Sequence, residues 1–364
     1  MRKLLFVLML VFTSLIYFSC DTAENPEDQN TDIPGDPTGV TVPTPTKNNV
    51  LPSASFTTTG SRVKLNLLGL IDPTTNQPLT LSYNSTNPQA SNIFVEEDGI
   101  VQGLKVSKVG TGNVLTADIV FCVDNSGSMG DEADSVAASI IEFANYLQAS
   151  GLDVKFAVVG YDSYPNGGIN FTNAQTLNSY LNRTDYYGPV TGTSRTEDFS
   201  GPDSAALYNR ANNFGYAGGE NGVIAAIFAD SVYGWRAGAQ RVFINFTDEP
   251  TQSLSDGTWN NAMGCSLLSG KATVHTVFSE DSTYWTFNQY DERPWELSTC
   301  TGGTIKFIPD DATGLNLKDL PVAGALANSY LVEYVSAKTG VAHTVKITVY
   351  TATADGVQTF NITY

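Results

Sequence analysis

Short apolar runs and amphipathic segments alternate along residues 117–326, and this alternation constrains the fold more than any other feature. Residues 117–123 read ADIVFCV, a continuous apolar run of strand length, and the segment 131–149 that follows has apolar residues at helical spacing. Further apolar runs of strand length lie at 155–160, 241–246, 272–278 and 304–308. The predicted helices between and after them lie at 174–182, at 221–231, around 265, before 300 and at 315–326. Strands that alternate with helices form a parallel sheet that helices cover on both faces, so we expect an α/β domain.

Two segments with strand-like alternation flank this α/β segment. Apolar and polar residues alternate over 62–67 in the first (50–113) and over 341–349 in the second (328–364). Asp355-Gly356 is a hairpin-turn signal in the second segment. Because neither segment is long enough for a sandwich by itself, we expect one β domain built from both, with the α/β domain inserted. Two separate small β modules are the alternative.

The first 19 residues have the anatomy of an export signal. A basic start precedes a mostly apolar run at 4–18, which is shorter than the roughly 20 residues that a membrane span needs. The run ends in Tyr-Phe-Ser-Cys, which resembles a bacterial lipobox and implies that Cys20 becomes the lipidated first residue; an ordinary signal peptide is the alternative. Residues 20–49 are rich in Pro and acidic residues, so we expect an extended linker.

The acidic residues after Cys20 resemble the surface-export signal of Bacteroidota lipoproteins, whereas Asp21 alone resembles an inner-membrane retention signal of enterobacteria. We expect a lipid-anchored protein of the bacterial cell envelope, placed on the outer membrane and exposed at its surface. The membrane face itself stays open at this point.

The charge balance excludes several classes of partner. Lys and Arg number 19 and Asp and Glu number 37, for a net charge of −18. Nucleic acids and anionic lipid surfaces require basic patches, so we expect no nucleic acid and no membrane contact beyond the lipid anchor. Both histidines, His275 and His343, lie in predicted strands and are expected to pack there rather than bind metal. The sequence contains no hydrolase nucleophile elbow and no zinc-protease helix motif, so we expect a non-enzymatic protein.

Polar residues with oxygen ligands follow the predicted strands where they end. The run DNSGS begins at Asp124, directly after an apolar run, and supplies hydroxyls at Ser126 and Ser128; Asp248 follows a second apolar run, and Glu220 opens a predicted helix. Open parallel sheets bind ligands beyond the carboxyl ends of their strands, and hard oxygen ligands suit Mg²⁺. Each residue alone could be a helix cap or a turn residue. The three loops together predict a divalent cation site.

At these residues the chain resembles a von Willebrand factor type A (vWA) domain, with residues 124–128 as its metal-ion-dependent adhesion site (MIDAS) motif. The resemblance covers 114–327 and implies a Rossmann-like fold that holds one Mg²⁺ or Mn²⁺. It implies that the ligands, direct or through water, are Asp124, Ser126, Ser128 and Asp248. Most members carry a threonine in the middle loop; Glu220 stands there instead and resembles the integrin β version, in which a glutamate fills this role.

Asp131 and Glu132 follow the motif as an acidic pair. This pattern resembles the integrin β site for an adjacent Ca²⁺, but acidic residues also favour a helix N-terminus without any metal. Both explanations stay open.

The number and placement of the cysteines fit a protein that folds in an oxidising compartment. Cys265 and Cys300 form either a disulfide or two free thiols, because the sequence does not show the distance between them. Cys122 lies inside an apolar run and is expected to be a small buried hydrophobe.

The segment 184–217 is long for a connection and rich in aromatic residues. Its candidates for a partner-binding loop are Tyr186, Tyr187, Phe199, Tyr208, Phe214 and Tyr216. Long connections are commonly functional, and aromatic residues suit a recognition surface. A loop that packs on itself explains the composition equally well.

Two functions follow from these features. The first is a surface or envelope lipoprotein that binds a protein or glycan partner, whose carboxylate completes the coordination of the metal ion. The second is a structural component of an envelope assembly or fimbria in which the metal only stabilises the fold.

Overall fold

The apolar runs of the α/β segment form one seven-stranded sheet in the computed structural model, in the order β11-β8-β7-β6-β12-β14-β16. The structure describes residues 30–75, 77–108, 116–182, 185–187, 190–191, 199–320, 324–326 and 328–363. The export signal and Cys20 lie outside these residues. Within the described part, no helix is both long and apolar enough to cross a membrane.

Five strands of this sheet are parallel, as the sequence predicts. They are β6 (Thr116–Asp124), β7 (Asp153–Tyr161), β12 (Gln240–Thr247), β14 (Thr273–Phe278) and β16 (Ile305–Phe307). The sheet continues with β8 (Gly167–Thr172), which is antiparallel to β7, and ends with the short β11 (Gly201–Pro202).

Helices cover both faces of the sheet. Alternate residues of β6 belong to two hydrophobic clusters: Phe121 packs in the cluster of α1 (Ala133–Ala149) and α2 (Ala174–Leu181), and Val120 in the cluster on the other face. The second cluster includes residues of α3 (Ala205–Asn212), α4 (Gly222–Val232), α5 (Asn261–Leu268) and α6 (Trp295–Thr301). Burial on both faces explains why the central strand is apolar throughout, and the predicted α/β fold is confirmed.

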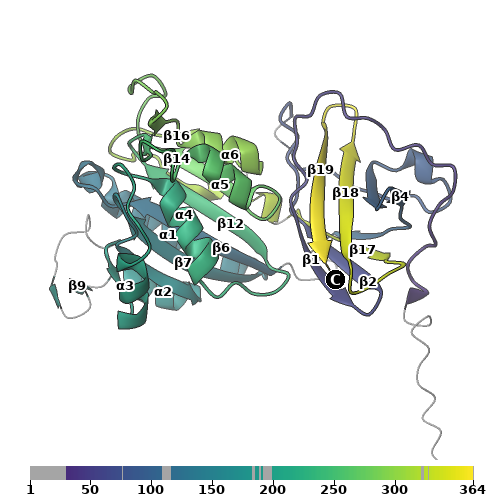
Figure 1. Cartoon of the computed structure of the whole chain (residues 1–364), viewed down its shortest axis with the longest axis horizontal. Helices are drawn as coiled ribbons and strands as arrows, with labels where there is room; N and C mark the ends of the chain where they lie inside the picture. The colour runs from purple at the N-terminus through teal and green to yellow at the C-terminus, as the bar shows by residue number, and fades with distance from the viewer. Residues whose placement is uncertain are drawn as a thin grey trace, which may run out of the picture.

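The two flanking β segments share both sheets of a sandwich, which lies to the right of the α/β domain in Figure 1. One sheet has the order β1-β2-β17-β5 and the other β19-β18-β3-β4. Their bounds are β1 (Ala54–Thr59), β2 (Arg62–Leu67), β3 (Ile93–Glu97), β4 (Ile100–Val101), β5 (Lys105–Lys108), β17 (Tyr330–Val335), β18 (Ala342–Tyr350) and β19 (Asp355–Thr363). Leu65, Val95, Val332 and Ile347 belong to one core between the sheets. The α/β domain is therefore inserted into a single β-sandwich, and not placed between two β modules.

The end of the α/β segment differs from the prediction. Instead of one helix over 315–326, the described residues contain a 3₁₀ helix at Leu317–Asp319 and a helical turn at 324–326. Leu317, Leu320 and Leu326 are nevertheless buried in the cluster that contains α1. The spacing of apolar residues therefore predicted correctly which side chains are buried, but it did not predict the backbone conformation.

Part of the predicted linker lies on the sandwich and does not extend away from it. Asp32 forms ion pairs with Arg62 on β2 and Lys105 on β5, at 2.8 and 2.5 Å. Thr41 exchanges two hydrogen bonds with Gln89, at 2.9 and 2.8 Å. These polar contacts order residues 30–49, although the segment has almost no apolar side chains to bury.

Asp355 fixes the end of this segment, and it is not the turn residue that the sequence suggests. It begins β19, is 0% exposed, and its carboxylate accepts the backbone N–H groups of Thr46, Lys47 and Asn48 at 3.1, 2.7 and 2.7 Å. Burial opposes ionisation, but these hydrogen bonds outweigh it and lower the pKa of Asp355 to about 2. One carboxylate therefore binds three consecutive amides of the N-terminal segment.

We predict that Asp355→Asn releases residues 38–49 from the sandwich. Asparagine has the same shape as aspartate, but its NH₂ group is only a donor. It cannot accept the backbone hydrogen bonds that the second carboxylate oxygen of Asp355 accepts. A lower melting temperature and faster proteolytic cleavage within 38–49 are the expected results. Asp310→Asn, at an exposed site, is the control. Equal cleavage rates in both variants would contradict this role of Asp355.

Candidate functional site

The parallel strands β6, β7, β12 and β14 end at one edge of the sheet, and the predicted ligands lie there. Asp124 is the last residue of β6, and Asp248 follows the last residue of β12, which is paired with β6. Asn125 N donates to the oxygen of Tyr161 at the end of β7 at 2.8 Å, and Ser279 N donates to the oxygen of Thr247 at 3.1 Å. The loops after all four strands are thus joined by backbone hydrogen bonds.

The DNSGS loop curves around the carboxylate of Asp124, which is 1% exposed. The N–H of Ser126 donates to Asp124 Oδ1 at 3.0 Å, and the hydroxyl of Thr247 donates to Oδ2 at 2.8 Å. The Ser126 and Ser128 hydroxyl oxygens lie 2.9 Å apart. The loop then enters a 3₁₀ helix (Gly127–Gly130) that leads to α1. A carboxylate and two hydroxyls are therefore gathered at the end of the central strand.

Asn125 anchors the loop from its other side. Its amide exchanges two hydrogen bonds with the amide of Asn166, at 2.6 and 3.0 Å, and also donates to Ser200 Oγ at 2.9 Å. Asn166 precedes β8, and Ser200 precedes β11. The residue between the two predicted ligands is thus held by side chains from two other segments.

Asp248 provides the observation that tests whether the site suits a cation. Its Oδ1 atom is buried and has no hydrogen-bond partner among the described residues. The backbone oxygen of Asp248 accepts from Trp285 Nε1 at 2.7 Å, which fixes the loop without involving Oδ1. A buried carboxylate oxygen without a partner is costly, and a bound cation would satisfy it.

Electrostatics support the same interpretation. Burial raises the pKa of Asp124 well above its ordinary value, and the nearby charge of Asp248 adds to this effect. Burial also raises the pKa of Asp248, which the Ser128 hydroxyl counteracts and Glu220 and Glu280 reinforce. Two carboxylates and two hydroxyls fit a hard cation such as Mg²⁺ or Mn²⁺, and Asp124, Ser126, Ser128 and Asp248 are the residues that would hold it.

Glu220 lies close enough to Asp248 for its charge to raise the pKa of that carboxyl, and its role as a metal ligand stays a prediction. It lies beside Glu249, whose pKa is raised by burial and by the charge of Glu220. Among the described residues, no three Asp, Glu, His or Cys side chains converge closely enough to hold one ion. Gly219 passes so close to the Gln252 side chain that a Cβ there would clash with it, so the middle loop packs on the loop after β12.

Asp131 and Glu132 lie in different environments. Asp131 is exposed, whereas Glu132 is buried and accepts a hydrogen bond from Ser279 Oγ at 2.6 Å. Burial raises the pKa of Glu132 to about 7, and the Ser279 hydroxyl counteracts this shift. Glu132 therefore links the start of α1 to the end of β14, and an adjacent metal site at this pair stays a prediction.

The comparisons with known proteins agree with this geometry. Residues 118–262 match the family model of the von Willebrand factor type A domain. The chain contains a VWA domain. Its matched region begins within β6, includes the DNSGS loop and Asp248, and ends within α5.

No curated protein sequence matches the chain. Among solved structures, the chain is similar to a pilus adhesin, SpaC from Lactobacillus rhamnosus GG in an open conformation, with 11% sequence identity and a TM-score of 0.33. The similarity covers 86% of this chain and 55% of the adhesin, so the chain spans about half the length of that protein.

The aromatic residues predicted for a partner-binding loop of the VWA domain divide into two groups. Phe199 is 1% exposed, so it belongs to the core and is wrong as a contact residue. Phe214 is half-buried and packs against Phe228 with ring centroids 5.1 Å apart. Tyr208 and Tyr216 are exposed. The side chains of Tyr186 and Tyr187 lie outside the described residues.

The cysteines form the disulfide that the sequence left as one of two alternatives. Cys265 on α5 and Cys300 on α6 are bonded, with Cα atoms 5.8 Å apart. Cys122 is a free, buried thiol on β6, as expected from its apolar surroundings. The disulfide joins two helices on one face of the VWA domain.

Several residues that fix the site were not found from the sequence. Asn221 is 0% exposed, caps α4 through Ile224 N at 2.9 Å, and donates to the oxygens of Gln252 and Trp259. An asparagine before an apolar helix is a recognised capping signal and could have revealed it. Asn166 and Trp285 lie in irregular loops, where no periodic pattern marks them.

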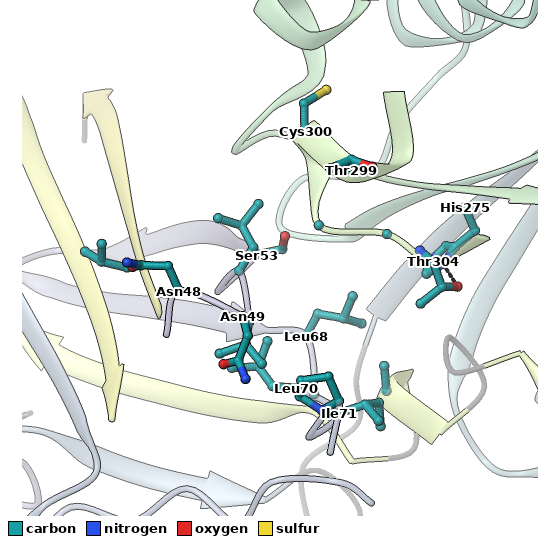
Figure 2. Close-up of a pocket in the computed structure, with 18 residues that line it drawn as sticks. Asn48, Asn49, Ser53, Leu68, Leu70, Ile71, His275, Thr299, Cys300 and Thr304 are labelled. Carbon is teal, nitrogen blue, oxygen red and sulfur yellow. Dashed lines mark hydrogen bonds between the residues drawn. The ribbon is translucent and has the colours of Figure 1, made fainter. Parts of the chain in front are cut away.

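Both histidines are packed, as predicted. His343 Nδ1 lies 2.9 Å from Asp98 Oδ2. His275 lies beside a cavity of about 670 Å³ between the VWA domain and the sandwich, where Figure 2 shows it next to Thr304 and across from Leu68 and Leu70. Its Nδ1 accepts the N–H of Thr304 at 3.1 Å, and its Nε2 is buried without a partner in the described part of the chain. Burial lowers the pKa of His275 to about 4.

We predict that Thr247→Val weakens Mn²⁺ binding by about tenfold, because outer partners orient metal ligands. Valine keeps the shape of threonine but removes the hydrogen bond that fixes Asp124 Oδ2. Isothermal calorimetry with Mn²⁺ measures the change. Thr276→Val is the matched control and should bind Mn²⁺ normally. Thr276 lies on β14, the strand beside β12, and its buried hydroxyl is bonded to that of Ser298 on α6. Unchanged affinity in Thr247→Val would contradict the assigned geometry.

We also predict an acid-sensitive contribution from His275. Because its folded pKa of about 4 lies below the ordinary 6.5, the neutral form stabilises the fold above pH 6.5 and this contribution falls as pH drops toward 4. The loss is roughly 3 kcal/mol in total. His275→Asn, which keeps an acceptor for Thr304, should unfold in denaturant with a smaller dependence on pH between 6.5 and 4. An identical pH dependence in both proteins would refute the prediction.

Proposed function

We propose that this protein binds a protein or glycan partner through a divalent cation, Mg²⁺ or Mn²⁺, at a metal-ion-dependent adhesion site. The buried Oδ1 atom of Asp248 carries the proposal, because none of the residues that the structure describes hydrogen-bonds to it, and it lies at the edge where Asp124 and the two serine hydroxyls are gathered. The presence of a VWA domain supports it, since Asp124, Ser126, Ser128 and Asp248 all fall within the matched region.

The composition of the proposed ligand set explains why the cation would bind an external group. Two carboxylates neutralise a divalent ion, and the hydroxyls of Ser126 and Ser128 add no charge. Such an ion stays electrophilic enough to accept a carboxylate from a partner. Ser128 is exposed, so the ligand set lies at the surface, where a partner can reach it.

We propose binding rather than catalysis. The loops at the carboxyl edge, residues 124–134, 161–166, 216–222, 247–254 and 279–292, contain no His, Lys or Cys. They therefore offer no histidine or lysine general base and no thiol nucleophile beside the ion.

The export signal and Cys20 support placement of the protein as a lipid-anchored component of the outer membrane.

The alternative role is a structural component of an envelope assembly or fimbria in which the ion only stabilises the fold. The same Asp248 atom is compatible with it, because any bound cation would satisfy that oxygen. The two roles differ in whether a partner depends on the ion.

The test is binding of envelope and host-matrix proteins and glycans to the immobilised chain, in Mn²⁺ and in chelator. We expect at least one partner whose binding falls more than tenfold in chelator and equally in Asp124→Ala. Glu142→Gln, a charge removal on the exposed side of α1, should bind like the wild type. If binding of every partner were unchanged in chelator and in Asp124→Ala, while the melting temperature rose in Mn²⁺, the structural role would be favoured.

A further inference from the structure

The edge of the sheet that carries the proposed metal site is extremely acidic. The five loops at this edge, residues 124–134, 161–166, 216–222, 247–254 and 279–294, contain twelve Asp and Glu residues and one basic residue. That residue is Arg293, which lies over the Phe287 ring and 3.7 Å from Glu296. The chain as a whole has about half as many basic as acidic residues, 19 against 37. The ratio of twelve acidic residues to one basic residue is therefore local to this edge and does not follow from the average composition.

Backbone hydrogen bonds show that these loops form one surface. Asn221 N donates to the oxygen of Asp162 at 3.2 Å, and Gln252 N donates to the oxygen of Glu220 at 3.0 Å. Ser253 N donates to the oxygen of Tyr290 at 2.8 Å. Together with the contacts of Asn125 and Ser279 described above, these bonds join all five loops.

Three basic residues of the domain lie at the opposite edge, where the strands begin. Arg236 pairs with Asp118 and Asp153 at the starts of β6 and β7, both at 2.7 Å. Arg241 and Lys271 both pair with Asp230. These cations are far from the carboxyl edge along the strands and are matched locally by carboxylates, so they do not offset its charge.

A divalent cation would cancel only two of the negative charges at the carboxyl edge. A partner that contributes a carboxylate adds another negative charge, and a surface of one sign repels partners of the same sign. We propose that the partner is a cationic protein segment whose metal-binding Asp or Glu is flanked by Lys or Arg, and not an anionic glycan. This inference rests on the proposed metal-dependent function and names the chemistry of its partner.

Exposed aromatic rings beside the site support a cationic partner independently of the charge count. Tyr216 is 59% exposed and lies against Tyr164, with ring centroids 4.9 Å apart, two residues before the middle loop glycines. Tyr284 is 64% exposed and packs edge-on against Trp285, whose indole N–H is fixed to Asp248. Exposed tyrosine faces attract Lys and Arg side chains through cation–π interactions.

The test uses synthetic peptides of equal length with one central Asp, flanked by Lys and Arg, by Ser and Gly, or by Asp and Glu. Fluorescence polarisation measures their binding to the full chain in saturating Mn²⁺ and in chelator, with an anionic polysaccharide as a further probe. We expect the basic-flanked peptide to bind at least tenfold more tightly than the neutral one. Its affinity should fall steeply with salt, and neither anionic probe should bind.

A double variant tests whether the acidic edge causes this preference. Glu280→Gln with Asp281→Asn removes two charges beside the site and should reduce the preference for basic flanks by several-fold. Glu142→Gln with Asp319→Asn removes two charges elsewhere on the domain and should leave the preference unchanged.

The outcomes separate this inference from the proposed function. Metal-dependent binding of the neutral peptide or of the polysaccharide with equal affinity would overturn the inference while leaving metal-dependent binding intact. If no probe bound in a metal-dependent way, the result would contradict both the proposed function and the inference.

Discussion

One carboxylate is buried at the end of the central strand of the α/β domain, and its burial determines the electrostatics of the candidate site. Asp124 lies on β6, between β7 and β12, and burial makes its ionised form costly. Hydrogen bonds from Ser126 and Thr247 offset part of this cost, and a cation would offset more. The apolar strand that buries Asp124 is therefore also the element that creates the demand for positive charge at this edge.

The β-sandwich leaves this edge free. Contacts between the domains involve residues that precede the strands of the VWA domain: Gly238 before β12 accepts hydrogen bonds from Ser55 and Asn66 of the sandwich, at 2.8 and 2.6 Å. Figure 1 shows the sandwich on one side of the α/β domain only. Because parallel strands begin at one edge and end at the other, the candidate site faces away from the domain contact and is available to a partner.

The sequence predicted what depends on burial and strand ends, and missed what depends on tertiary contacts. Apolar runs located the parallel strands because both faces of the sheet are covered, and their ends located Asp124 and Asp248. Phe199 was predicted as a recognition residue because the sequence of a long connection does not show whether another segment covers an aromatic side chain. The assignment of Glu220 to the metal stays a prediction, and the path of its loop includes a close contact between Gly219 and Gln252 that no local pattern encodes. The docking of residues 30–49 likewise depends on Asp355, which is more than 300 residues away in sequence from the amides that it binds.

The central claim is that one cation binds at the carboxyl edge of the sheet between Asp124 and Asp248. A crystal structure of the protein grown with Mn²⁺, with anomalous scattering measured at the manganese edge, tests it most directly. The account predicts a single strong anomalous peak in contact with Ser126, Ser128 and the Oδ1 atom of Asp248. A peak at another part of the surface, or none at this edge in saturating Mn²⁺, would contradict it.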